Sequence, residues 1–331
     1  MFAFARFALA ALLALPAVAA SAEEVPILRI YTYDSFAAEW GPGPAIKAGF
    51  EASCVCVVEF IAADSSIGAL RRVQLEGPDT EADIVLGLDT AIAGEARATG
   101  LFAPHGVDLS GLALPTAWTD PEFVPFDYGY FAFVYDSDLL SNPPTSFEEL
   151  IAMPDGVRIV IEDPRSDTPG LGLVLWIRHL YGERAPEIWR GLKPHILTVA
   201  RDWSEAYALF LNGEADMVLS YTTSPAYHAI TEGDASYAAA DFGGHYAQIE
   251  VAGILKSSGK QQLARDFLAY LVSPEAQAII PTTNWMYPVA GGALPAEFGD
   301  LVVPREVLLT DEATVTANKN AWIEEALAAI R

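Results

Sequence analysis

The chain has 331 residues, of which 52% are hydrophobic and 19% charged, a composition that supports a large buried core and excludes a disordered chain. Its 44 acidic residues outnumber its 19 basic residues, which gives a net charge of −25. This charge argues against nucleic acid and against anionic lipid, because both need a basic surface on the protein. We therefore expect no nucleic-acid or membrane-surface partner, and either two domains or one large α/β domain.

The first 22 residues have the pattern of a secretory signal peptide. Arg6 and the free amine give a weakly positive start, an apolar stretch covers residues 7–19, and small residues at 17–22 offer cleavage sites. No later stretch is long and apolar enough for a membrane span. The pattern predicts an exported protein, and the alternative is a retained N-terminal anchor.

Strand and helix patterns alternate over the first hundred residues, as in a βαβ unit with a parallel sheet. The predicted strands are residues 25–30, 56–61 and 82–88, and the predicted helices are residues 45–52, 67–76 and 91–99. The first strand leads into residues 31–44, which are rich in aromatic side chains. Ligands bind at the carboxyl ends of strands in open α/β sheets, so this stretch is a candidate wall of a ligand site. The alternative is that its aromatic residues belong to a core.

Two long strand patterns indicate that the chain leaves one lobe and later returns to it. Residues 123–136 form an aromatic, β-prone run, and residues 246–255 alternate between apolar and polar positions. A second α/β unit lies between them, with predicted strands at residues 157–162, 198–200 and 217–221. We therefore expect an α/β fold of two lobes with mixed, mainly parallel sheets, a hinge and a cleft between the lobes.

The predicted division of the chain follows from these two crossings. It has a signal peptide at residues 1–22, a first lobe made of residues 23–124 and 248–331, and a second lobe made of residues 125–247. The long helix predicted at residues 315–330 falls in the first lobe by this division.

The only two cysteines are Cys54 and Cys56, and the cysteines of an exported protein are expected to be paired. A disulfide between residues two apart closes a very small loop, so it acts locally and not between domains. We therefore predict a local disulfide between Cys54 and Cys56.

Sequence motifs of catalysis and of metal binding are scarce. The five histidines are scattered without a pair at i, i+4, and no nucleophile elbow, P-loop or dinucleotide fingerprint is present. Asp163 and Asp167 could bind a metal, but capping and turning their loop is the expected role. We therefore expect no enzyme activity, no metal and no cofactor.

Six aromatic residues fall in loops, or at strand ends just before helices, where core aromatics are less common. They are Tyr33, Trp40, Trp203, Tyr221, Tyr227 and Trp285. Large amphipathic rings in such places are typical of solute recognition in a cleft. With a carboxylate beside them they suit a flat organic cation, through cation–π contacts and charge pairing.

Three long strings resemble the periplasmic thiamine-binding proteins of bacterial ABC importers: YTYDSFAAEWGPGP at 31–44, VPFDYGYFAFVYD at 124–136 and LSYTTSPAYH at 219–228. Shorter strings extend the resemblance over nearly the whole mature chain, at residues 163–165, 168–173, 203–207 and 284–289. The spacing of Cys54 and Cys56 is also similar to that family. The resemblance implies a type II periplasmic binding protein that holds thiamine or its phosphates and delivers them to a membrane permease. It also implies a location in the periplasm, and we expect a monomer.

The same resemblance implies which residues of this chain contact the ligand. Polar contacts are carried over to Asp34 and Asn284, and aromatic contacts to Tyr33, Trp40, Trp203, Tyr221, Tyr227 and Trp285. Where the family is expected to hold a phosphate, this chain has Ser65 and Ser66 in one loop and Asp167 in another. Because a carboxylate at Asp167 repels phosphate, we expect a preference for free thiamine.

Three rival interpretations differ in the chemistry of the cleft. An enzyme similar to the type I thiaminases needs a nucleophilic cysteine, but Cys54 and Cys56 precede a strand and are expected to be paired. A ferric-ion receptor uses adjacent tyrosines, whereas Tyr221 and Tyr227 lie six residues apart. Another organic cation, such as a polyamine or choline, also suits the aromatic residues.

Overall fold

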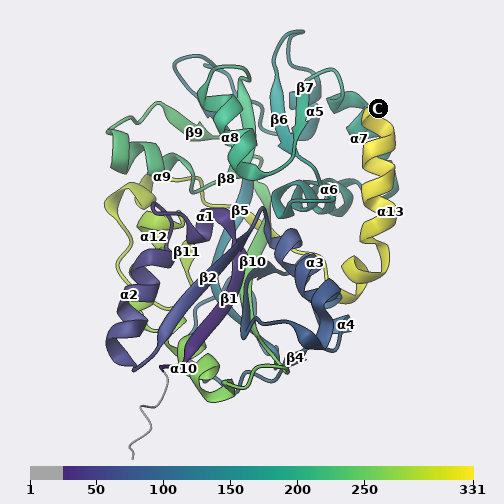
Figure 1. The fold of residues 1–331 in the computed structure, drawn as a ribbon. Coiled ribbons are helices and arrows are strands. Elements are labelled where there is room, and N and C mark those ends of the chain that lie inside the picture. Colours follow the sequence, from purple (N-terminus) through teal and green to yellow (C-terminus); the bar gives the residue numbers. More distant parts are fainter. Residues whose placement is uncertain (1–24) are drawn as a thin grey trace, which may run out of the picture.

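A computed structural model describes residues 25–331 of the chain, shown in Figure 1. The predicted signal peptide at residues 1–22 lies outside the described residues. Across residues 25–331 no helix is both long enough and apolar enough to span a membrane.

Two long strands run through the middle of the molecule and connect its two halves (Figure 1). β5 (Phe123–Asp136) and β10 (Gly244–Leu255) pair antiparallel with each other. They are the central strands of a sheet whose main order is β2-β1-β3-β10-β5-β8-β6-β7. The two predicted crossing strands are present, and the predicted lobe boundaries at residues 124 and 248 fall inside them.

The first half is the predicted parallel βαβ unit, because β1 pairs in parallel with both β2 and β3. Its elements are β1 (Ile27–Tyr33), α1 (Asp34–Ala37), α2 (Gly43–Ser53), β2 (Val57–Ala63), α3 (Ser66–Glu76), β3 (Ile84–Asp89), α4 (Ala93–Ala98) and β4 (Phe102–Ala103). β3 is buried along its whole length, as expected of an apolar strand in a parallel sheet. Ser65 caps α3, since its hydroxyl accepts a hydrogen bond from the Gly68 N–H at 3.1 Å.

The second half has a mixed sheet, in which β6 pairs in parallel with β7 and β8 while β8 pairs antiparallel with β5. Its elements are α5 (Phe147–Ile151), β6 (Ile159–Glu162), α6 (Thr168–Tyr181), α7 (Ala185–Leu192), β7 (Ile196–Ala200), α8 (Trp203–Leu211), β8 (Met217–Tyr221), α9 (Pro225–Tyr227) and β9 (Tyr237–Ala239). The helix predicted from residue 171 begins earlier, at Thr168, because Pro169 fits the first turn of a helix.

The remaining elements follow β10, and the first two of them pack against α2 in the first half. In chain order these elements are α10 (Gln261–Leu271), α11 (Pro274–Gln277), α12 (Ile280–Thr283), β11 (Tyr287–Pro288), β12 (Glu306–Leu308) and α13 (Glu312–Ile330). The loop predicted at residues 281–288 therefore contains a short helix and a short strand. Pro281 lies in the first turn of α12, where it needs no backbone donor.

The last helix, α13, contacts both halves of the molecule. It packs against α4 in the first half and against α6 and α7 in the second half (Figure 1). Lys319 pairs with Glu95 of α4 at 2.5 Å, and Glu325 pairs with Arg178 of α6. The sequence assigned this helix to the first lobe by chain order alone, which does not show such a double contact.

Cys54 and Cys56 are joined by a disulfide between α2 and β2. This position is the amino end of β2, opposite to the end of the strand that leads into α3. The disulfide is therefore local, and it lies at the other end of the parallel sheet from the aromatic stretch after β1.

Candidate functional site

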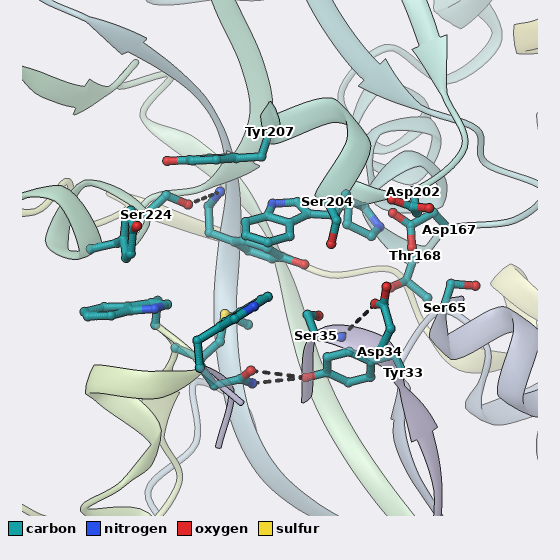
Figure 2. Close-up of a pocket in the computed structure, with 18 of the residues that line it drawn as sticks. Tyr33, Asp34, Ser35, Ser65, Asp167, Thr168, Asp202, Ser204, Tyr207 and Ser224 are labelled. Carbon is teal, nitrogen blue, oxygen red and sulfur yellow. Dashed lines mark hydrogen bonds between the residues drawn. The ribbon is translucent and has the colours of Figure 1, made fainter. Parts of the chain in front are cut away.

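A cavity of about 570 Å³ lies between the two halves, at the carboxyl ends of β1, β2 and β8 (Figure 2). Residues of both halves line this cavity, and all eleven residues predicted to contact a ligand are among them. These eleven are Tyr33, Asp34, Trp40, Ser65, Ser66, Asp167, Trp203, Tyr221, Tyr227, Asn284 and Trp285. The structure therefore brings together residues that lie up to 252 positions apart in the chain (285 − 33).

One wall of the cavity comes from the end of β1 and the loop after β2. Tyr33 is the last residue of β1, Asp34 opens α1, and Figure 2 shows both on the same side as Ser65. The Ser65 hydroxyl donates to the backbone oxygen of Ser166 at 2.5 Å, so the two halves touch at this end. The side chain of Trp40 lies in the turn after α1 and is 56% exposed, which leaves its ring open to a ligand.

The opposite wall comes from the beginning of α8. Asp202 caps this helix by accepting a hydrogen bond from the Glu205 N–H at 2.9 Å, and Trp203 is the first helical residue. The indole N–H of Trp203 donates to the Ser220 hydroxyl at 2.9 Å, and its ring lies 5.0 Å from that of Tyr207. The cap, the hydrogen bond and the ring contact together hold an aromatic pair in the cavity lining.

A second aromatic pair is formed by Tyr227 and Trp285, whose rings meet edge to face with centroids 5.4 Å apart. Within residues 25–331, Trp285 is the one residue other than glycine with a positive φ, at 55°. This left-handed conformation costs a bulky residue roughly 1–3 kcal/mol, and such strain concentrates at ligand sites. Tyr221 is held separately, because its hydroxyl donates to Gln248 Oε1 at 2.6 Å.

Two buried carboxyl groups lie beside Tyr33. The Tyr33 hydroxyl donates to Glu250 Oε2 at 2.8 Å, and Asn284 Nδ2 donates both to Asp127 Oδ2 at 2.6 Å and to the Tyr33 hydroxyl at 3.1 Å. Burial raises the pKa of Asp127 to about 7. Burial, followed by the charge of Asp127, raises the pKa of Glu250 well above its ordinary value. These four side chains therefore form one polar network at the side of the aromatic cavity.

Another group of carboxyls lies at the beginning of α6 and α8. Asp167 precedes α6, Asp202 precedes α8, and Figure 2 shows the two close together. Burial, followed by the charge of Asp202, raises the pKa of Asp167 to about 8. Glu162 is fully buried nearby, and burial and the Asp167 charge raise its pKa too. Asp167 therefore keeps its proton in most molecules at pH 7, and its repulsion of phosphate is weaker than the sequence predicts.

The charged side chains of the lining have one sign. No lysine, arginine or histidine is found among the described residues that line the cavity, whereas five acidic residues are: Asp34, Asp64, Asp167, Asp202 and Glu250. Metal-binding groups of three or more His, Cys, Asp or Glu side chains are also absent from the described part of the chain. The cavity therefore suits a cation better than an anion.

Sequence reasoning missed several residues of this site. Tyr207 had a signal, because it follows Trp203 by four residues and so shares its face of a predicted helix. Asp202 also had one, as an aspartate just before that helix. Glu250 and Asp127 had none, since they face each other only through the register of β10 and β5.

Comparison with known proteins first shows the broad class to which the chain belongs. The family described as Bacterial extracellular solute-binding protein matches residues 45–278, which is most of the chain. A Ferric binding protein from Campylobacter jejuni has a TM-score of 0.74 at 20% identity, and the match covers 91% of this chain and 99% of that chain. At this identity the likeness shows a shared fold alone, which is that of a two-lobed periplasmic binding protein.

Proteins with higher sequence identity to this chain show which family within that class it belongs to. The Thiamine-binding periplasmic protein of Escherichia coli strain K12 is 50% identical over 301 residues, covering 91% of this chain and 92% of that protein. A solved structure described as a Periplasmic thiamin binding protein has a TM-score of 0.91 at 50% identity, covering 93% of this chain and 97% of that chain. The chain belongs to the family of thiamine-binding periplasmic proteins within the bacterial extracellular solute-binding proteins. The resemblance and the fold predicted from the sequence are thereby confirmed.

Proposed function

We propose that the protein binds thiamine in the cavity between its halves and delivers it, in the periplasm, to the permease of an ABC importer. The observation that carries this proposal is the lining itself, with seven aromatic and five acidic side chains and no basic one among the described lining residues. Thiamine has a permanent thiazolium cation and a flat aminopyrimidine ring. Each cation–π contact in a desolvated site contributes about 1–2 kcal/mol, so such a lining favours this ligand.

The size and the position of the cavity support the same proposal. Its volume of about 570 Å³ falls within the range of roughly 300–1,000 Å³ that small-molecule sites occupy. β5 and β10 connect the two walls, so bending at these strands closes the halves around a ligand. A permease that favours the closed form would then respond to the loaded protein and not to the empty one.

Binding without catalysis is part of the proposal. Cys54 and Cys56 are bonded to each other, and neither is among the residues that line the cavity. A nucleophilic thiol, which a thiamine-cleaving enzyme of the type considered above needs, therefore has no counterpart in the described lining. Incubation of thiamine with the protein and a nucleophilic base should leave thiamine intact, and turnover that a Cys54→Ser change removes would contradict this part.

We also propose that free thiamine binds more tightly than its monophosphate and pyrophosphate. Asp34, Asp64 and Asp202 line the same cavity as Asp167, and these three carboxylates add negative charge to a lining in which the resemblance implies a phosphate near Ser65, Ser66 and Asp167. Isothermal titration calorimetry with the three ligands tests this preference. Pyrophosphate binding that is as tight as thiamine binding would overturn the preference but not the thiamine site.

Tryptophan fluorescence tests the central proposal, because Trp40, Trp203 and Trp285 line the cavity. Thiamine should quench the fluorescence, and Trp203→Ala and Tyr227→Ala should each weaken its binding by about 10-fold, the equivalent of one lost cation–π contact. Trp322→Phe removes a tryptophan outside the cavity and is the matched control. Absence of quenching in the parent protein would overturn the proposal, and tighter binding of choline or a polyamine would assign the site to another cation.

A further inference from the structure

Glu250 lies in the cavity lining in the middle of a row of acidic residues. The residues directly opposite it on the two flanking strands are Asp89 of β3 and Asp127 of β5. All three side chains are at least nine-tenths buried. The two charged groups that act most strongly on Glu250 are these same two aspartates, so its charge is opposed from both sides.

The negative charge of Asp89 is compensated by groups within the fold. Its Oδ1 atom accepts hydrogen bonds from the backbone N–H groups of Ala91 and Ile92 at 2.9 and 3.2 Å. Lys319 also lowers the pKa of Asp89, although burial is the larger effect and raises it to about 6. Asp89 therefore has partners for a negative charge, and its role is to hold the turn after β3.

Negative charge on the pair formed by Glu250 and Asp127 is not compensated in this way. Glu250 accepts one short hydrogen bond, from the Tyr33 hydroxyl, and a long one from Asn284 at 3.4 Å. Asp127 accepts from Asn284 through Oδ2, while its buried Oδ1 has no hydrogen-bond partner among the described residues. Glu250 and Asp127 lie opposite each other on paired strands and both are buried, so they do not both ionise and the pair retains a proton when no ligand is bound.

We propose that Glu250, supported by Asp127, is the counter-charge that makes the cavity select a ligand with a fixed positive charge. This inference rests on the proposed function, and it assigns to Glu250 the recognition of the positive charge of thiamine. On binding, the thiazolium cation takes the place of the proton that the pair holds, and the proton passes to solvent. Glu250 faces the ligand, and Asp127 is a positioning residue behind it. The low dielectric of a buried site makes such a pairing stronger than it is in water.

The test compares thiamine with its neutral isostere, in which a thiophene replaces the thiazolium ring. Calorimetry at pH 7 should show that the parent protein binds thiamine at least about 10-fold more tightly, which is the scale of one charge-assisted contact. Glu250→Gln should remove most of that ratio and leave the Kd of the isostere within about two-fold. Glutamine keeps an oxygen that can accept from Tyr33. Glu306→Gln, the same change at an exposed glutamate that does not line the cavity, is the control and should leave the ratio unchanged.

A second measurement needs no variant. Titrations at one pH in two buffers of different ionisation enthalpy give the protons released per ligand, which should be a measurable fraction for thiamine and none for the isostere. Glu250→Gln should abolish that difference, which separates this pair from Asp167. A parent protein that fails to bind thiamine would overturn the proposed function. Equal binding of both ligands, or an equal loss of both in Glu250→Gln, would overturn the counter-charge and leave thiamine binding intact.

Discussion

Replacing Asp167 with asparagine should remove a pH dependence from the stability of the protein. The Asp167 side chain is 5% exposed, and burial together with the charge of Asp202 raises its pKa from 3.8 to about 8. In the unfolded chain the same group ionises near its ordinary value. Between pH 5 and pH 8 the unfolded chain has lost a proton that the folded protein keeps, so the free energy of unfolding falls as the pH rises.

The magnitude follows from the width of that pH range. Each pH unit changes the free energy of unfolding by about 1.4 kcal/mol, so Asp167 lowers it by about 4 kcal/mol between pH 5 and pH 8. The Asp167→Asn protein lacks this group, and its advantage over the parent protein should therefore grow by about 4 kcal/mol over the same range. Asparagine has a similar volume and is also a favoured residue just before a helix, so α6 keeps its start.

Urea unfolding of the ligand-free proteins, followed by circular dichroism at several pH values from 5 to 8, measures this difference. Asp64→Asn is the matched control, because it removes an exposed carboxylate from the same cavity. Its effect should stay within about 0.5 kcal/mol across the range. An advantage of Asp167→Asn that is the same at pH 5 and pH 8 would refute the argument from burial.

Three further predictions use other features of the site and of the fold. The affinity of thiamine monophosphate relative to thiamine should fall between pH 6 and pH 9, because Asp167 ionises near pH 8, and calorimetry at both pH values measures the ratio. Gly87→Ala should weaken thiamine binding by about 10-fold or more in a fluorescence titration, since Gly87 has a φ of 91° and a Cβ there would lie 2.3 Å from the Tyr33 ring. Thiol titration after unfolding without reductant should detect neither Cys54 nor Cys56, and two reactive thiols would contradict the disulfide.

Local sequence patterns were sufficient for the first half of the fold and for six aromatic residues of the cavity, whereas its predicted polar contacts came from the resemblance. The continuous apolar run of β3 predicts a buried parallel strand, and Ser65 before an apolar helix predicts a cap; both are present. The aromatic residues in loops and at strand ends were predicted to line a cleft, because ligands bind at the carboxyl ends of strands in open α/β sheets. Tyr33 and Trp285 are far apart in the sequence, but the fold brings both of them to the same cavity.

Features that depend on strand register or on burial could not be predicted from the sequence. The pairing of Glu250 with Asp127 follows from the register of β10 and β5, which a single sequence does not reveal. The left-handed conformation of Trp285 follows from the turn between α12 and β11. The pKa of Asp167 depends on burial, so a residue that the sequence treats as a fixed charge is mostly neutral at pH 7.

The net charge of −25 and the acidic cavity act on a ligand by different means. Exposed charges are screened beyond about 8–10 Å at moderate salt, so most of the 44 acidic residues affect solubility and the first encounter with a cation. Glu250 and Asp127 are buried, and screening by salt reaches them much less. Salt should therefore slow the association of a cationic ligand, while the preference for a cation over its neutral isostere persists. By the proposal made above, the choice of ligand thus depends on two buried carboxyls and not on the overall charge.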